Sequence, residues 1–113
     1  MSSWQENGEL MRIRYTFRHM NANDRLKKHT AGKLERLSRF EDREIDIHVT
    51  FGQEKHHHIV EFQVIGGHGT FVSHEMRDDM YEAIDLAVDK LDRQLSREKS
   101  RRKDHKARMH VSV

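Results

Sequence analysis

The sequence predicts an α+β fold with the element order β-α-β-β-β-α, in which two helices pack on one face of a four-stranded sheet. Two observations predict this fold. Apolar and polar residues alternate in four short segments, and apolar residues recur every three or four positions in two longer ones. At 113 residues the chain has the length of one compact domain. Both apolar helical faces are buried together most simply when the helices cover the same face of the sheet.

The four strands are predicted from a period of two in apolar residues, which is typical of a strand with one buried face. They are expected at residues 12–17, 45–51, 60–64 and 70–76. A short polar link at residues 52–55 predicts that the second and third strands pair as a hairpin. The fourth strand should return antiparallel, although the adjacent Phe71 and Val72 leave its inward face open.

The two helices are predicted from apolar residues at helical spacing. The first is expected at residues 24–39, with Asn23 and Asp24 available as caps. Its buried face consists of Leu26, Thr30, Leu34 and Leu37. Gly32 lies inside this helix and should cost about 1 kcal/mol relative to alanine. The second helix should begin near residue 78, and its apolar face consists of Tyr81, Ile84, Ala87, Val88, Leu91 and Leu95.

Polar segments flank this pattern and set the expected domain boundaries. We expect a flexible N-terminal extension at residues 1–10, one folded domain at residues 11–102 and a flexible basic tail at residues 103–113. Cysteine is absent, which excludes disulfides and thiolate metal sites. The longest apolar run is only three residues, so a membrane span and an export signal are not expected. The sequence therefore predicts a soluble, cytoplasmic protein.

Charge is nearly balanced over the whole chain but is unevenly distributed. The 21 Lys and Arg residues and 19 Asp and Glu residues give a net charge of +2. Residues 93–108 contain eight basic and only two acidic residues, so the rest of the chain is net acidic. A basic segment on an acidic body favours a polyanionic partner such as nucleic acid. A solvated tail without function is the alternative that composition leaves open.

Both helices have basic residues on their polar sides. In the first helix these are Arg25, Lys28, His29, Lys33, Arg36 and Arg39, and in the second Lys90, Arg93, Arg97 and Arg101 beside a separate acidic stripe. Two parallel basic stripes could bind a phosphate backbone with little sequence specificity. The aromatic residues occupy core positions, which favours structured RNA over base stacking. Lys90 and Arg93 lie off the apolar face, so reversing their charge should leave the fold intact.

Catalytic and metal-binding patterns are weak in this sequence. His74 and Glu75 lack the second histidine of a zinc-protease motif, and the glycine-rich run at residues 66–69 is typical of a turn. Residues 56–58 are three consecutive histidines, and strand alternation would send the middle one to the opposite face. We therefore expect no catalytic residue, no cofactor, no metal site and no small-molecule substrate.

Several short motifs resemble the ribosome hibernation promoting factor family, which includes the related ribosome-associated inhibitor protein. The most specific match is the segment from Asp79 to Asp85 followed by the segment from Asp89 to Leu95 and a basic tail. Further matches are Asn23-Asp24, Lys33-Leu34-Glu35-Arg36-Leu37, Glu54-Lys55 and His58-Ile59-Val60-Glu61. The resemblance covers residues 11 to about 103, and Gly32 departs from it by replacing a helix former.

The resemblance implies a stress-response protein that binds in the decoding channel of the small ribosomal subunit. There it would block messenger and transfer RNA and inhibit translation. It also implies a fold similar to double-stranded RNA-binding domains, a monomeric short-type member, and a separate ribosome modulation factor as a further candidate partner. The expected ribosomal RNA contacts are Lys33, Arg36, Lys90, Arg93, Arg97, Lys99 and Arg101. The alternative is an accessory domain that binds structured RNA generally.

Overall fold

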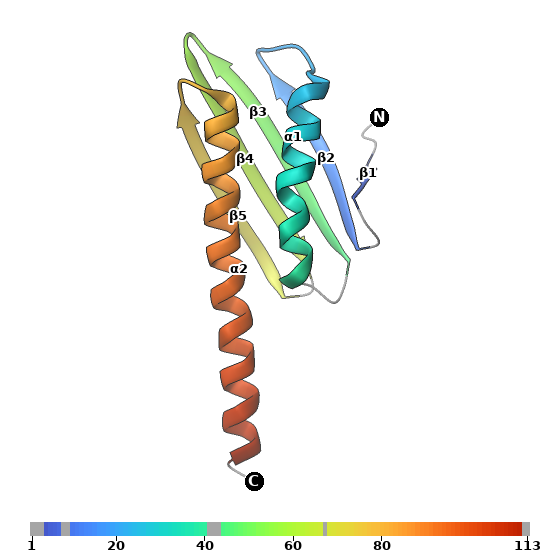
Figure 1. Cartoon of the computed structure of the whole chain (residues 1–113), viewed down its shortest axis with the longest axis vertical. Coiled ribbons are helices and arrows are strands. Elements are labelled where there is room, and N and C mark those ends of the chain that lie inside the picture. The colour runs from blue at the N-terminus through green and yellow to red at the C-terminus, as the bar shows by residue number, and fades with distance from the viewer. Residues whose placement is uncertain (1–3, 8–9, 41–43, 67, 112–113) are drawn as a thin grey trace.

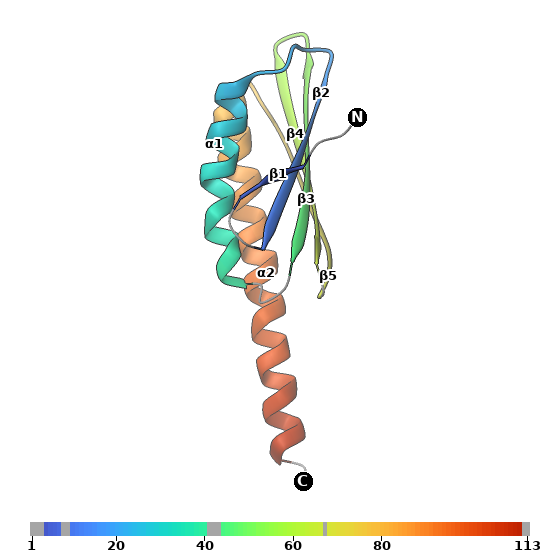
Figure 2. The same ribbon diagram turned by 90° about the vertical axis from the view of Figure 1, so that its right-hand side faces the viewer.

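The structure is a computed structural model that describes residues 4–7, 10–40, 44–66 and 68–111, the last eight of these by their backbone alone. The chain forms two layers, a mixed β-sheet and a pair of helices (Figure 1). Figure 2 shows both helices on the same side of the sheet. The predicted α+β class and the packing of two helices on one face are thus confirmed.

The sheet has five strands in the order β1-β2-β3-β4-β5. Strands β2 and β3 are parallel, and every other neighbouring pair is antiparallel. The strands are β1 (Gln5–Glu6), β2 (Met11–Arg18), β3 (Ile45–Glu54), β4 (His57–Gly66) and β5 (Gly69–Arg77). The helical segments are α1 (Asp24–Leu34), the 3-10 helix η1 (Glu35–Phe40) and α2 (Met80–Val111). The helical crossover between β2 and β3 is what permits their parallel pairing.

The predicted count of four strands is wrong because β1 adds a fifth at the edge. Gln5 pairs with Ile13 of β2, within the segment predicted to be a flexible extension. The Trp4 ring lies 5.0 Å from the guanidinium carbon of Arg12 and 5.0 Å from that of Arg14. A two-residue strand is too short to show an alternating pattern, so sequence periodicity could not detect it.

The first helix is shorter than predicted and changes its geometry after Leu34. The predicted helix at residues 24–39 is an α-helix only to Leu34 and continues as the 3-10 helix η1. Buried Leu34, Leu37 and Phe40 recur every three residues. A 3-10 helix has three residues per turn, so this spacing keeps all three on the core side. Asn23 caps α1 as expected, because its side chain accepts hydrogen bonds from the backbone of Arg25 and Leu26.

Helix α2 extends well past the sheet (Figure 1). Its 32 residues span about 48 Å at 1.5 Å per residue. The backbone is helical through Val111, although the sequence predicted a flexible tail from residue 103. Within the described part of the chain, every helix is too short or too polar to cross a membrane.

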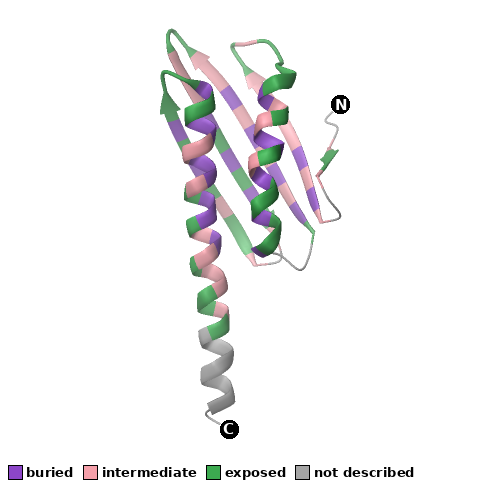
Figure 3. Cartoon of the chain, in the orientation of Figure 1, coloured by how far each residue is buried: buried purple, intermediate pink, exposed green. Residues whose placement is uncertain are grey.

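The core lies between the helices and the inward face of the sheet (Figure 3). On β5 that face carries Phe71, Ser73 and Glu75, whereas Val72 is exposed on the other side. Phe71, and not Val72, is therefore on the inward face of this strand, a choice that the sequence left open. The Ser73 hydroxyl donates a hydrogen bond of 2.9 Å to the carbonyl oxygen of Ala87, which ties β5 to α2.

Replacing Gly32 by alanine should stabilise the protein by about 1 kcal/mol, because glycine is a poor residue inside a helix. A Cβ atom at Gly32 would meet no other atom within 4 Å. Thermal denaturation checks this, with Gly69→Ala as a control that should destabilise because Gly69 has φ of +128°. A lower melting temperature for Gly32→Ala would contradict the prediction.

Candidate nucleic-acid interface

Helix α2 is joined to α1 and η1 by a row of ion pairs, which we call the interhelical seam. It consists of His29 and Lys33 with Asp85, Arg36 with Asp89 and Asp92, and Arg39 with Asp92. The shortest contacts are 2.7 Å, from His29 Nε2 to Asp85 Oδ1 and from Arg36 Nε to Asp92 Oδ2. The residue numbers of the paired side chains rise together along both helical segments, as expected for helices that run in the same direction.

The seam corrects the expectation that two free basic stripes run side by side. Four basic residues, His29 and Lys33 of α1 and Arg36 and Arg39 of η1, face the acidic stripe of α2, whereas Arg25 and Lys28 remain exposed. Asp85 and Asp89 are half-buried rather than fully solvated. The acidic stripe therefore serves to hold the helices together, a role that helical phase alone cannot reveal because it does not show how two helices face each other.

Asp92 is the most buried acid of the seam, with 12% of its side chain exposed. Burial acts to raise the pKa of Asp92, but the hydrogen bonds and charges of Arg36 and Arg39 outweigh it and hold the pKa below its usual range. Arg39 donates to both carboxylate oxygens, at 2.9 and 3.1 Å. Asp92 is thus a charged anchor for the end of α1 and for η1.

Lys90 is paired with a buried acid on the sheet. Its Nζ lies 2.6 Å from Glu75 Oε1, and the Glu75 side chain is only 8% exposed. This hydrogen bond is the main reason that the pKa of Glu75 is lowered, helped by the positive charge of Arg77. The expectation that Lys90 could be reversed in charge without affecting the fold is therefore wrong, because a second carboxylate there would face Glu75.

Beyond the seam, three arginines form a row along the outer side of α2, which we call the basic row. They are Arg93, Arg97 and Arg101, spaced four residues apart on one helical face. Arg93 and Arg97 are exposed, and the Arg101 side chain is 76% exposed with Glu98 at 3.3 Å. The row thus places three exposed positive charges along one face of α2.

Two other basic side chains at this end of α2 bind the body of the domain. Lys99 Nζ donates to the carbonyl oxygen of Arg39 at 3.2 Å, and Arg102 donates to that of Phe40 at 3.5 Å. Arg102 also contacts the His68 ring at 2.6 Å. These contacts hold α2 against the end of η1 and the β4–β5 turn, so the basic row extends from a fixed base.

The seven residues predicted to contact ribosomal RNA thus fall into three environments. Lys33 and Arg36 belong to the seam, Lys90 and Lys99 contact the domain body, and Arg93, Arg97 and Arg101 form the basic row. Arg39 and Arg102 also hold the helices in place, a role that spacing along the sequence does not reveal. The excess of acidic residues in the first half of α2 is the feature of the sequence that indicates pairing with a basic partner.

The opposite face of the sheet is polar and internally paired on β2 and β3, whereas Ile65, Val72 and Met76 are exposed on its β4 and β5 part. Arg12 forms a bidentate pair with Asp46, with its shorter contact at 2.9 Å. The His48 ring contacts the Thr16 hydroxyl at 2.9 Å. Burial, followed by the charge of Arg14, lowers the pKa of His48. On this face the charge of Arg12 is therefore paired with Asp46.

Comparison with known proteins identifies relatives over most of the chain. The family described as Sigma 54 modulation protein / S30EA ribosomal protein matches residues 13–103. A ribosome hibernation promoting factor from Azotobacter vinelandii is 32% identical over 91 residues, which cover 80% of this chain and 85% of that protein.

Two solved structures have the same fold. A ribosomal subunit interface protein from Coxiella burnetii is 32% identical, with a TM-score of 0.71, covering 80% of this chain and 99% of that one. The N-terminal domain of Protein Y from Thermus thermophilus is 29% identical, with a TM-score of 0.72, covering 79% and 98% respectively.

Substituting Asp92 by asparagine should lower the free energy of unfolding at neutral pH by about 1–3 kcal/mol, because it leaves Arg39 without its charged partner and Arg36 with Asp89 alone. Because the pKa of Asp92 is lowered in the folded protein, the ionised carboxylate stabilises the fold at pH values above the usual aspartate pKa. This stabilisation is lost as the pH falls through the pKa of the folded state. The variant should therefore lose less stability than the parent below about pH 4. Urea denaturation at several pH values tests this, with Asp24→Asn as the exposed control; parallel pH profiles of parent and variant would contradict it.

Substituting Lys90 by methionine should destabilise the fold by about 1–3 kcal/mol, because the buried Glu75 carboxylate loses its closest donor. Replacing Glu75 by methionine in the same chain should restore part of that loss, since no buried charge is then left unpaired. Chemical denaturation of the single and double variants measures both effects. If the Lys90→Met variant is as stable as the parent, Lys90 does not stabilise the buried Glu75 carboxylate.

Proposed function

Because the chain belongs to the Sigma 54 modulation protein / S30EA ribosomal protein family, we propose that it is a ribosome hibernation factor. In this proposal it binds the small ribosomal subunit in the decoding channel. There it obstructs messenger RNA and transfer RNA and inhibits translation during stress or stationary phase. The role requires occupancy of a site rather than a chemical step, so the protein acts without catalysis.

The observation that supports this proposal most is the basic row on α2. Its three arginines are accessible and share one helical face. Arginine on a helix binds phosphate oxygens through charge-assisted hydrogen bonds, and release of the counterions supplies the affinity. Such binding carries little sequence information, which suits a partner recognised by the position and shape of its RNA backbone.

The seam residues have a secondary part in the proposed contact. Lys33 and Arg36 keep 43% and 41% of their side chains exposed while paired with α2. Their outer edges can meet a phosphate group, but each must share its charge with an aspartate. We therefore assign the main electrostatic contribution to the basic row and a weaker one to Lys33 and Arg36.

The arrangement of α1, β3, β4, β5 and α2 supports a further part of the proposal. These elements place three antiparallel strands beside two helices on one face, an order that is similar to double-stranded RNA-binding domains. Such domains recognise the shape of RNA across its grooves rather than its sequence. We also propose a separate ribosome modulation factor as a partner on the ribosome.

Replacing Arg93 and Arg97 by glutamate should abolish co-sedimentation with ribosomes at physiological salt, because two phosphate contacts become repulsive. Both side chains are exposed, so the circular dichroism spectrum and melting temperature should stay close to the parent values. With glutamine at both positions, binding should persist and its salt dependence should weaken, with the log–log slope shallower by about 1.5–2. Sucrose-gradient sedimentation, scored for subunits, monomers and dimers, measures the outcome.

The matched control is Arg18→Glu with Lys55→Glu, which makes the same charge change at the opposite end of the sheet. This control should co-sediment as the parent does. Equal loss in both double variants would show that net charge, not the basic row, governs binding. Recovery of the parent protein only in free RNA fractions would contradict the hibernation role and favour a general structured-RNA-binding domain.

A further inference from the structure

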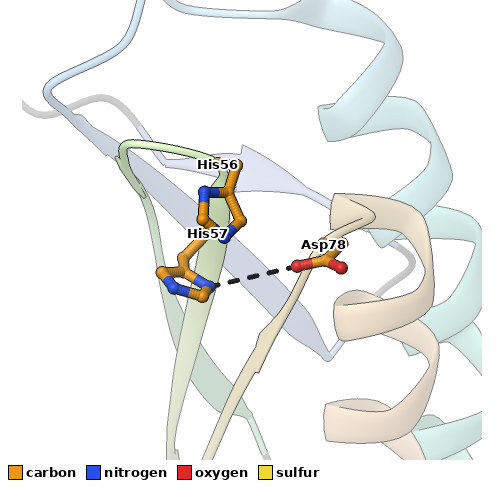
Figure 4. A group of neighbouring side chains, drawn as sticks. All are labelled: His56, His57 and Asp78. Carbon is orange, nitrogen blue, oxygen red and sulfur yellow. Dashed lines mark ion pairs between the residues drawn. The ribbon is translucent and has the colours of Figure 1, made fainter.

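A group of metal-binding side chains lies at the end of the sheet farthest from the basic row. His56 and His57 occupy the turn and the first position of β4, and Asp78 lies between β5 and α2 (Figure 4). One donor atom from each residue lies within 4.8 Å of the other two. These residues come from segments about twenty positions apart in the chain and are not used in the proposed RNA contact.

The turn geometry explains why the two histidines meet. Glu54 pairs with His57 across the β3–β4 hairpin, so Lys55 and His56 form the connection. Lys55 has a positive φ of 56°, which turns the chain sharply. His56 is thus outside the strand, where alternation does not apply, and its ring lies 4.3 Å from that of His57. The sequence expectation that adjacent histidines must point apart is wrong at this pair.

Asp78 completes the group from the neighbouring strand. Its Oδ1 atom lies 4.0 Å from Nδ1 of His57, and 87% of its side chain is exposed. The next residue, Asp79, has a different role because it accepts a hydrogen bond of 3.0 Å from the backbone of Tyr81 at the start of α2. Asp78 is therefore positioned beside the histidines while its neighbour caps the helix.

The donor set and its spacing fit a divalent transition metal. In a tetrahedral zinc site with bonds of about 2.0–2.1 Å, ligand atoms lie about 3.4 Å apart. The 4.0 Å separation of His57 and Asp78 closes to this value with small rotations of exposed side chains. Two imidazoles and one carboxylate are ligands that zinc accepts, with water in the fourth position. Calcium and magnesium, which take oxygen ligands, do not fit this set.

We propose that His56, His57 and Asp78 form a zinc-binding site that links the β3–β4 turn to the start of α2. The bound ion would add a bridge between these two segments beside the exposed pair of His57 and Asp78. His58, the third histidine of the run, is paired with Gln53 and Arg77 in the sheet and lies on the same face as buried Val60, and it is not one of the three clustered donors. The site is separate from the basic row and does not depend on the proposed function.

Isothermal titration of the untagged full chain with ZnCl2 at about pH 7.5, where free imidazole is neutral, tests this site. We expect one zinc ion per chain and a rise in melting temperature with zinc. His57→Ala and Asp78→Asn should each weaken binding by at least about tenfold. His74→Gln removes an exposed histidine outside the group and should bind as the parent does.

The asparagine variant distinguishes a built site from weak binding by a histidine-rich surface. Asp78 is exposed and caps no helix, so its substitution should leave the zinc-free melting temperature unchanged. Binding that is unaffected by Asp78→Asn, or that falls equally in His74→Gln, would overturn the proposal. Titration that shows no binding, or several weak equivalents spread over the other histidines, would overturn it as well.

Discussion

The interhelical seam is the interaction on which the rest of the structure depends. Arg36 and Arg39 converge on Asp92, the most buried acid of the seam, and this fixes α2 against α1 and η1. The seam also determines the electrostatics of the surface, because it uses the basic residues of one helix to neutralise the acids of the other. Where the seam ends, the exposed arginines of the basic row continue along α2.

The two halves of α2 therefore have different tasks. The first half packs its apolar face on β4 and β5 and pairs its acids with α1, while Lys90 neutralises buried Glu75. The second half is anchored by Lys99 and Arg102 and presents its arginines to solvent. A continuous helix joins them, so the position of the proposed RNA contact is set rigidly by the packing of the core.

Periodicity in the sequence was sufficient for the longer elements and failed where geometry changes over one or two residues. The strands around Phe51 and Phe62 and the helix around Val88 have regular spacing, so they could be predicted. The 3-10 segment that ends at Phe40 breaks the helical period, and β1 is too short to have one. Contacts between distant segments, such as Asp78 with His57, depend on how strands and helices face each other, which spacing along the chain does not encode.

We propose that the basic row lies against small-subunit ribosomal RNA, and the absence of cysteine from the sequence allows a direct measurement of this contact. A single cysteine in place of exposed Ser100, beside the row, can hold a tethered reagent that cleaves nearby RNA when the protein binds ribosomes. If the basic row contacts this RNA, cleavage of small-subunit RNA from this position should be localised, and a cysteine in place of Asn21, at the far end of the domain, should give a different pattern. Cleavage from Asn21→Cys alone, or the same pattern from both positions, would contradict it.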